Sequence, residues 1–532
     1  MNYSVGIDFG TESGRAVVID LKDGRIIGSA EHAYRHGVID ERLPGSDDRL
    51  PFSSALHDPD DYLEILETVV PAAVRESGVD PSQIVAFGVD STASTPLPAL
   101  DDGTPLSRLP HHRSSRHAYA RLWKDHSSQP WASRLNTVWA ERAPDLLARY
   151  GGTVSSEWLM PKSLQLFDEA PELFDEAGYI LEVGDWLTWQ LTGTLRRNAS
   201  VAGYKACHQP DLGGFPDADL LEALSPGFSA LLPKLAGELS YPGDAAGTLS
   251  ARWQQRLGLG PITVGVSNMD AQVAVLAAGI DRPGQLLLVM GTSVCDMLVA
   301  DDLRPVAGIS GVVHQGMLPD SYGYEAGQAG VGDSLNWFVR RFADGDHQEL
   351  IRLIQDPTQD GPKVLALEWL NGTRSPLVDP SLSGVFVGMT LDTRPHHIYL
   401  ALLEGAAFGQ QLIIENFRAQ GLPVDEIIVC GGLGLKNPVL MQLLADATGL
   451  PVSAVESANL PATGAALHAA VAAGVFADHS QAAAQCRPKV AALYSPTPEG
   501  RADLAPRLRT YQQLFAYFGV EHPQIMHALR GV

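Results

Sequence analysis

Cysteine is scarce in this chain of 532 residues, and long apolar runs are absent from it. The four cysteines, Cys207, Cys295, Cys430 and Cys486, lie far apart and form no CxxC pair. This spacing argues against a disulfide framework or a cysteine zinc site, and it favours a reducing, cytoplasmic location. No run approaches the ~18 apolar residues of a membrane span, and the N-terminus lacks the basic flank and apolar core of a signal peptide.

Positive charge is also scarce. The 38 Lys and Arg stand against 62 Asp and Glu, so the formal net charge is −24. This balance argues against nucleic acid or an anionic membrane as a partner. It leaves a nucleotide open, because a local group of backbone amides can hold phosphate within a negative protein.

The length exceeds what one hydrophobic core usually serves, so we expect two or three domains. Residues 235–260 are polar and rich in Gly and Pro, which is typical of a boundary. We therefore predict an N-terminal domain over residues 1–255, a C-terminal domain over 256–485, and a helical tail over 486–532.

Residues 262–293 place an acid and a small turn at the ends of two predicted strands. Ile262–Val266 is followed by Asp270, and Leu286–Met290 opens into Gly291-Thr292-Ser293. A carboxylate can accept the proton of an attacking hydroxyl, and a small turn lets backbone N–H groups approach phosphate oxygens. Alternatively, Asp270 caps a helix and the turn is an ordinary hairpin. This stretch alone leaves both interpretations open.

The N-terminus repeats this plan. Strands over 5–9 and 15–20 flank a small turn, and a third strand over 25–33 completes a meander. The same strand-turn-strand pattern in the second half predicts a duplicated fold with one phosphate-binding turn in each half.

Other segments carry weaker indications. Residues 111–145 are polar and helix-like and contain four histidines, but no HxxxH or HExxH spacing holds, so they do not predict a metal site. Residues 202–206 (AGYKA) are predicted to be a loop with one isolated lysine. The Gly-rich turn over 431–434 follows a strand and precedes a helix, which suits a nucleotide but is common without one. Residues 460–474 predict a small-residue helix that packs closely on its neighbour.

Six motifs in order resemble those of the FGGY family of carbohydrate kinases. They are IDFGTESGR (7–15), EWLMPKSLQL (157–166), SNMDA (267–271), MGTS (290–293), GVFVGMTLDTRPHHIYLALLEG (384–405) and CGGLGLKNPVLMQLLAD (430–446). The resemblance implies an α/β protein with the duplicated actin/hexokinase-like (ribonuclease H-like) ATPase fold, with two domains around a cleft.

Within the family, the chain is most similar to the L-ribulokinase branch. The features that carry this similarity are HGVIDERLP (36–44), DSTAST (90–95), HAYARLWKDH (117–126), YGGTVSSEW (150–158), AGYKA (202–206) and GYEAGQ (323–328). The similarity implies ATP-dependent phosphorylation of the 5-hydroxyl of L-ribulose in arabinose catabolism. Ser91, Ser94 and Gln272 depart from the residues expected in that branch, and they leave the exact ketopentose open.

The resemblance also implies roles for individual residues. Asp270 is the expected general base, and Asp8 the expected Mg²⁺ ligand, mainly through water. Arg15 is a candidate phosphate partner, and Lys436 is the alternative to Asn437 in the adenosine pocket. The expected phosphate-binding residues are Gly10, Thr11, Ser13, Gly291 and Thr292. The expected adenosine-pocket residues are Gly332, Asn336, Gly432 and Asn437, and the expected sugar contacts are Ala93, Lys205, Asp270 and Glu325.

Three other functions stay open. The first is a kinase for another ketopentose or polyol, such as D-ribulose, xylulose or ribitol. The second is an ATP-dependent chaperone or filament protein on the same fold, and the third is a catalytically inactive sugar sensor. The expected partners are a small sugar and ATP rather than nucleic acid or membrane, with a homodimer as one candidate assembly.

Overall fold

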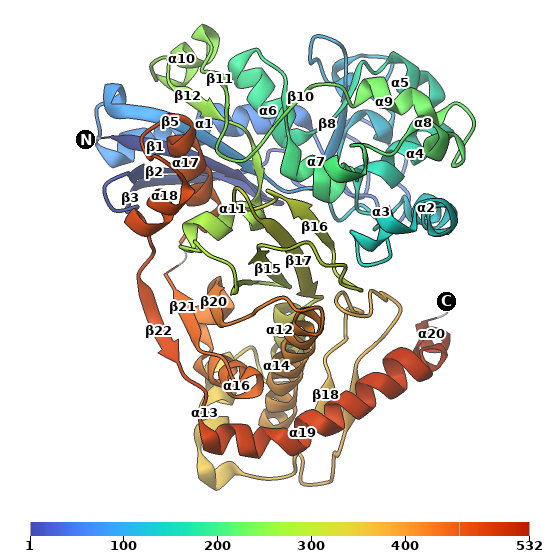
Figure 1. Cartoon of the computed structure of the whole chain (residues 1–532), viewed down its shortest axis with the longest axis vertical. Coiled ribbons are helices and arrows are strands. Elements are labelled where there is room, and N and C mark those ends of the chain that lie inside the picture. The colour runs from blue at the N-terminus through green and yellow to red at the C-terminus, as the bar shows by residue number, and fades with distance from the viewer. Residues whose placement is uncertain (1, 457, 531–532) are drawn as a thin grey trace. The chain divides into compact units, whose positions relative to one another are not determined.

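The computed structural model describes residues 2–456 and 458–530, which divide into two compact units (Figure 1). The first unit comprises Met1–Asp281, Val312–Gly323 and Asn459–Arg487, and the second comprises Arg282–Gly311, Tyr324–Ala458 and Pro488–Val532. Among the described residues, no helix combines the length and the apolar character that a bilayer span requires.

The first unit is built on a mixed sheet. Strand β1 (Tyr3–Phe9) pairs antiparallel with β2 (Ser13–Asp20), which pairs antiparallel with β3 (Ile26–Ala33). On its other side β1 pairs parallel with β5 (Ile84–Ser91), which also pairs parallel with β12 (Thr263–Gly265) and β13 (Asn268–Met269). The edge strand β11 (Ala245–Thr248) is antiparallel to β12. The core strands are buried on both faces, as near-continuous apolar runs predict.

Two helices pack on this sheet. Helix α1 (Pro59–Ser77) starts after the N-cap Asp58, ends at Gly78 and packs on β2 and β3. Helix α17 (Leu460–Ala472) comes from the far end of the sequence and lies against β1 and β5 (Figure 1). A side chain at Gly6 or Gly88 would collide with the α17 backbone. This close packing confirms the small-residue helix that the sequence predicts.

The segment between β5 and β12 forms a second, mainly helical core around buried aromatic residues such as Trp139, Tyr150 and Trp158. Two helices of this segment, α6 (Val183–Thr192) and α10 (Ala251–Leu257), instead bury their side chains in the core of the sheet. The other elements of the segment are β6 (Pro96–Ala99), β7 (Ala120–Arg121), α2 (Gln129–Arg142), α3 (Pro144–Ala148), α4 (Leu159–Glu169), α5 (Pro171–Glu176), β8 (Tyr179–Glu182), β9 (Arg196–Asn198), α7 (Ala199–Lys205), α8 (Ala218–Glu222), α9 (Leu231–Lys234) and β10 (Glu238–Ser240). The unit also contains β4 (Leu56–His57), α11 (Asp270–Ala277) and α18 (His479–Gln485).

Another mixed sheet has the strand order β16-β17-β15-β14-β20-β21-β22, in which the edge strand β16 spans Gly311–His314. Strand β14 is antiparallel to β15 and parallel to β20, β20 is parallel to β21, and β22 is antiparallel to β21. The elements are β14 (Gln285–Met290), β15 (Val294–Ala300), β17 (Tyr322–Gln328), α12 (Val331–Phe342), α13 (His347–Gln355), β18 (Leu365–Leu367), β19 (Val385–Val387), α14 (Pro395–Ala419), β20 (Glu426–Cys430), α15 (Gly432–Lys436), α16 (Pro438–Thr448), β21 (Val452–Val455), β22 (Val490–Tyr494), α19 (Pro498–Ala516) and α20 (Gln524–Arg530).

The two sheets share one strand plan. Reading inward from the meander, the first runs β3-β2-β1-β5-β12 and the second runs β17-β15-β14-β20-β21. In the first sheet, the antiparallel pair β2–β1 is followed by the parallel pairs β1–β5 and β5–β12. In the second sheet, the antiparallel pair β15–β14 is followed by the parallel pairs β14–β20 and β20–β21. This repetition confirms the duplicated α/β fold.

Several local predictions are wrong. Residues 235–260 carry β10, β11 and α10 rather than a polar linker. The domain limits at residues 255 and 485 stay a prediction. The tail over 486–532 contains the strand β22 and then the helices α19 and α20. Residues 202–206 belong to helix α7 and its cap, and residues 111–128 are mostly turns that precede α2. The polarity of neighbouring residues did not predict these helices, strands and turns, because contacts with distant parts of the chain determine the local structure.

Candidate functional site

A group of acidic and amide side chains lies at one edge of the first unit's sheet. Asp8 on β1 is the register partner of Asp90 on β5, and Asp90 in turn pairs with Asn268 on β13. Asp270 follows two residues after Asn268 as the first residue of α11, and its Oδ1 accepts from the backbone N–H of Ala271 at 2.8 Å. Parallel strands therefore bring together three carboxylates that are far apart in the sequence.

These acids have the features of a cation site. Asp8 and Asp90 are buried, and neither Asp8 Oδ1 nor either Asp90 oxygen has a hydrogen-bond donor within the described part of the chain. Burial raises the pKa of Asp8 despite Arg15, whose Nη1 lies 3.7 Å from Oδ2. Burial, together with the charges of Asp8 and Asp270, raises the pKa of Asp90 well above its ordinary value. Unsatisfied carboxylate oxygens of this kind suit Mg²⁺, which binds one or two carboxylates and retains water.

The predicted phosphate turn of the first unit is anchored from several sides. The Gly10 N–H donates to Ser13 O at 3.1 Å, and the Tyr34 hydroxyl donates to Gly10 O at 2.9 Å. The Thr11 hydroxyl oxygen accepts from Trp123 Nε1 at 3.1 Å. The turn is therefore hydrogen-bonded to side chains from two other segments, those of Tyr34 and Trp123.

A buried histidine supports the same turn. Burial lowers the pKa of His57 to about 4, so its ring is neutral at pH 7. Its Nε2 lies 3.0 Å from Thr11 O and its Nδ1 lies 2.7 Å from the Tyr62 hydroxyl. Because a carbonyl can only accept, Nε2 carries the proton and Nδ1 accepts from Tyr62.

Ser13 and Arg15 point toward another acid. The Ser13 hydroxyl donates to Glu31 Oε1 at 2.6 Å, and Arg15 Nη2 donates to the same oxygen at 2.8 Å. Arg15 thus lies between the carboxylates of Glu31 and Asp8, and its structural role is to link these two acids. Its candidate role as a phosphate partner stays a prediction.

The loop that carries Ala93 is fixed by two buried charged residues. Glu182 accepts from the Ser94 hydroxyl at 3.0 Å and from the Thr95 N–H at 2.7 Å. Lys162 Nζ donates to the carbonyl oxygens of Ser94, Arg121 and Leu122 at 3.1, 3.2 and 2.6 Å. Ala93 itself is only partly buried. The hydroxyl group of Ser94 is therefore hydrogen-bonded to a buried carboxylate.

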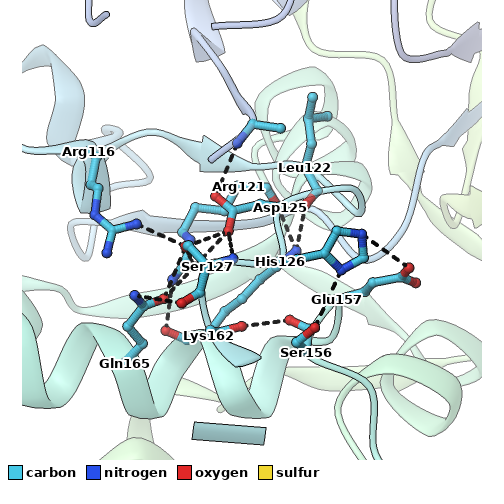
Figure 2. A network of polar contacts seen from close by, with 12 residues as sticks. Arg116, Arg121, Leu122, Asp125, His126, Ser127, Ser156, Glu157, Lys162 and Gln165 are labelled. Atoms are coloured by element: carbon cyan, nitrogen blue, oxygen red, sulfur yellow. Dashed lines mark hydrogen bonds and ion pairs between the residues drawn. The ribbon is translucent and has the colours of Figure 1, made fainter. Parts of the chain in front are cut away.

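Figure 2 shows that Lys162 belongs to a larger polar network. Arg121 Nη2 donates to Asp125 Oδ1 at 3.1 Å and to Gln165 Oε1 at 2.6 Å. Burial lowers the pKa of Lys162 to about 7, an effect that Asp125 opposes. This network joins α4 to the segment 121–127 and thereby to the Ala93 loop.

Lys205 is the last residue of α7 and is 6% exposed. Its Nζ lies 5.6 Å from the centre of the Trp158 ring. The start of α7 is tied to the segment that precedes Asp270, because Asn198 caps α7 and donates from Nδ2 to Ser267 O. The first unit thus holds Lys205 on a rigid helix rather than on the expected loop.

In the second unit, Gly291 and Thr292 form the turn between β14 and β15. The Gly291 N–H donates to Ser293 O at 2.9 Å, and both residues are exposed. Gly332, near the start of α12, lies so close that a Cβ there would collide with Gly291 O. The Asp333 N–H donates to Thr292 O at 3.2 Å. Gly332 is therefore a glycine because a helix start packs on the turn.

The Gly-rich turn after β20 lies beside this one, because β20 is the parallel neighbour of β14. Gly431 has φ of 96°, and a Cβ at this position would collide with Met290 O, whereas Gly432 faces open space. Gly431 belongs to the predicted Gly-rich turn over 431–434, but its close approach to Met290 was not predicted. Residues 432–436 form the short helix α15, where the sequence predicted a turn.

The remaining residues of the second unit that were predicted to bind nucleotide or sugar differ in exposure and in hydrogen-bond partners. Asn336 is exposed, and its Oδ1 lies 3.0 Å from His347 Nε2. Asn437 is buried and caps α16 by accepting from the Leu440 N–H at 3.0 Å, while Lys436 is exposed. Glu325 lies on β17 and is partly buried. The geometry of Asn437 identifies a structural role for its oxygen.

Comparison with known proteins defines the family. Residues 3–277 match the N-terminal domain, and residues 286–473 the C-terminal domain, of the FGGY family of carbohydrate kinases. The chain therefore belongs to this family and is a phosphotransferase that acts on a sugar hydroxyl with ATP as the phosphate donor.

Individual relatives agree with this assignment. The chain is 43% identical to a ribulokinase of Mycolicibacterium smegmatis, with 99% of this chain and 96% of that protein covered. It is 40% identical to a ribulokinase of Bacillus licheniformis, with 96% of each covered. A xylulose kinase from Lactobacillus acidophilus has the same fold, with a TM-score of 0.80 at 18% identity over 99% of this chain and 100% of that one. Family membership argues against the chaperone and filament alternatives.

Proposed function

We propose that the protein transfers the γ-phosphoryl group of ATP to the 5-hydroxyl of L-ribulose and forms L-ribulose 5-phosphate in arabinose catabolism. The observation that carries this choice of substrate is the 43% identity to a ribulokinase over nearly the whole of both chains. The acids at the sheet edge of the first unit support the chemistry, since phosphoryl transfer needs a base for the hydroxyl and a cation for the phosphates.

Asp270 is the proposed general base. Its position at the start of α11 leaves the carboxylate partly exposed, with one oxygen held by the Ala271 N–H. A carboxylate in this position can orient the sugar hydroxyl and take its proton as the bond to phosphorus forms. Mg²⁺, when bound with ATP, neutralises charge on the phosphate oxygens. Asp8 and Asp90 are the residues that would hold it, mainly through water.

The proposed phosphate, adenosine and sugar contacts follow from the chemistry of each residue. The backbone N–H groups of the two small turns, Gly10-Thr11 and Gly291-Thr292, suit phosphate oxygens. Gly332, Asn336 and Gly432 are proposed to line the adenosine pocket, with Asn437 and Lys436 as alternatives for one position. Lys205 and Glu325 supply a donor and an acceptor for sugar hydroxyls, and such a site discriminates strongly between epimers. Ala93 is the proposed apolar contact.

The test is a substrate panel. ADP formation from Mg·ATP would be followed with L-ribulose, D-ribulose, L-xylulose, D-xylulose and ribitol, and the product would be analysed for phosphate at O5. The highest kcat/KM with L-ribulose supports the proposal. A higher value with another sugar would retain the reaction and contradict the substrate, and variants at Ser91, Ser94 and Gln272 would then be examined.

A cytoplasmic location and a homodimer stay predictions. Use of ATP as the phosphate donor supports the location, because ATP is a cytoplasmic metabolite. Analytical ultracentrifugation of the full chain would measure the assembly.

A further inference from the structure

Two neighbouring histidines and a distant glutamate converge on the surface of the first unit. His111 and His112 lie in the turns after the segment 106–108, and Glu176 is the last residue of α5. The distance from His112 Nε2 to Glu176 Oε2 is 2.8 Å, and that from His111 Nε2 to the same oxygen is 3.1 Å. These three side chains each offer one metal-ligand atom, and the three atoms lie close enough together to bind one ion.

We propose that His111, His112 and Glu176 form a binding site for a borderline divalent metal ion such as Zn²⁺, separate from the Mg·ATP site. Their ligand atoms all lie within 4.8 Å of one another. Two imidazole nitrogens and one carboxylate oxygen are a ligand set that zinc accepts, whereas Mg²⁺ prefers oxygen ligands. Bonds of about 2.0–2.2 Å in a tetrahedral site would place the ligand atoms about 3.3–3.5 Å apart. The observed distances to Glu176 therefore need to widen by only a few tenths of an ångström.

The protein holds this arrangement from both sides. His112 is 6% exposed, its N–H donates to Leu109 O at 3.0 Å, and its own carbonyl accepts from Ser115 at 2.9 Å. Helix α5 is anchored by Leu173 and Phe174, which are buried in the helical core. The His111 side chain is 59% exposed and that of Glu176 is 38% exposed, so the outer coordination positions face water. Three protein ligands and an open position are typical of an accessible zinc site.

The surroundings attract a cation. Glu176 lines a surface cavity of about 570 Å³ together with Asp101, Asp102 and Asp175. Lys234 is the basic residue of that lining, and its ammonium donates to Ala177 O. The lining of this cavity, to which Glu176 belongs, thus carries a net negative charge, which raises the local concentration of divalent cations.

The HxxxH and HExxH patterns could not identify this group of residues in the sequence, because its three members do not have that spacing. His111 and His112 are adjacent, and the third ligand lies 64 positions further along the chain. In the absence of metal, the same atoms satisfy one another as hydrogen bonds between imidazole and carboxylate. The competing explanation is therefore a hydrogen-bonded cluster with no ligand.

The experiment is a Zn²⁺ titration of the full chain without a polyhistidine tag, after dialysis against chelator and with excess Mg²⁺ present. A chromophoric chelator competes for the metal and reports the affinity. We expect one equivalent of Zn²⁺ to bind, and His111→Gln and Glu176→Gln each to weaken binding at least about tenfold. His32→Gln, which removes an exposed imidazole elsewhere in the same unit, should bind as the wild type does.

Co²⁺ provides a second readout. A four- or five-coordinate Co²⁺ ion should give visible absorption in the wild type and lose it in His111→Gln, whose side chain is exposed enough to change without unfolding the protein. A wild type that takes no Zn²⁺ from the chelator, or equal affinity in wild type and His111→Gln, would overturn the site.

Discussion

Asp8 and Asp90 face each other as register partners on the parallel strands β1 and β5, both buried. Asp8 Oδ1 and both oxygens of Asp90 have no donor within the described residues. Two buried carboxylates in this relation repel each other, so the arrangement costs folding free energy and favours a bound cation.

The first prediction concerns Asp90. Asp90→Asn removes a buried carboxyl group whose ionised form is opposed by burial and by the charges of Asp8 and Asp270, so we expect a higher melting temperature together with a higher Mg²⁺ requirement for sugar-dependent ADP formation, by at least about tenfold. Thermal unfolding and Mg²⁺ titrations of the rate measure both. A variant that is less stable and keeps the wild-type Mg²⁺ requirement would show that Asp90 is only a structural acid.

The second prediction concerns Lys162, whose ammonium holds the Ser94 carbonyl and two others. Lys162→Met leaves three carbonyls without a donor and Asp125 with one fewer positive charge nearby, so we expect a loss of about 3 kcal/mol in the free energy of unfolding. Because the lysine supports the Ala93 loop, the KM for sugar should rise more than the KM for ATP.

Steady-state kinetics with each substrate varied in turn distinguish the two effects. Lys22→Met, at an exposed position, is the matched control and should change neither. Equal changes in both KM values for Lys162→Met would argue against a specific effect on the sugar loop.

The third prediction is a pH dependence from His57. An unfolded histidine titrates near 6.5, whereas His57 in the folded protein titrates at about 4 because it is buried. Between these values the unfolded chain binds a proton that the folded chain does not, so the free energy of unfolding falls as the pH is lowered. The contribution amounts to about 3 kcal/mol.

Urea unfolding at pH 7 and at pH 4.5 measures this change. His57→Gln should be less stable at pH 7 because it disturbs the bonds to Thr11 and Tyr62, and it should lose less stability on acidification. An acid loss equal to that of the wild type would contradict the assignment of a neutral, buried ring.

The fourth prediction compares two neighbouring glycines. Gly431 has a positive φ and abuts Met290 O, so Gly431→Ala should cost about 1–3 kcal/mol of stability from backbone strain. Gly432 faces open space, so Gly432→Ala should leave the melting temperature unchanged and weaken ATP binding. Calorimetric titration with ATP and thermal unfolding separate the two effects, and a stability loss in Gly432→Ala would contradict them.

The sequence indicated the duplicated fold because alternating apolar strands and small turns are local patterns. The end of β14 before Gly291 followed from its small turn residues in the same way. Residues that come together through the register of paired strands could not be predicted from local patterns, and the pairing of Asp90 with Asp8 is the main example. Lys205 was expected on a loop, but it is the last residue of the helix α7.

The most direct measurement is the sugar-dependent rate of ADP formation by Asp270→Asn. We expect a fall in kcat of about 10²–10⁴-fold, the usual contribution of a general base. The melting temperature should stay near that of the wild type, and Asp47→Asn, at an exposed position, should keep full activity. Wild-type turnover of L-ribulose by Asp270→Asn, in a protein shown to be folded, would contradict the proposed base and the mechanism built on it.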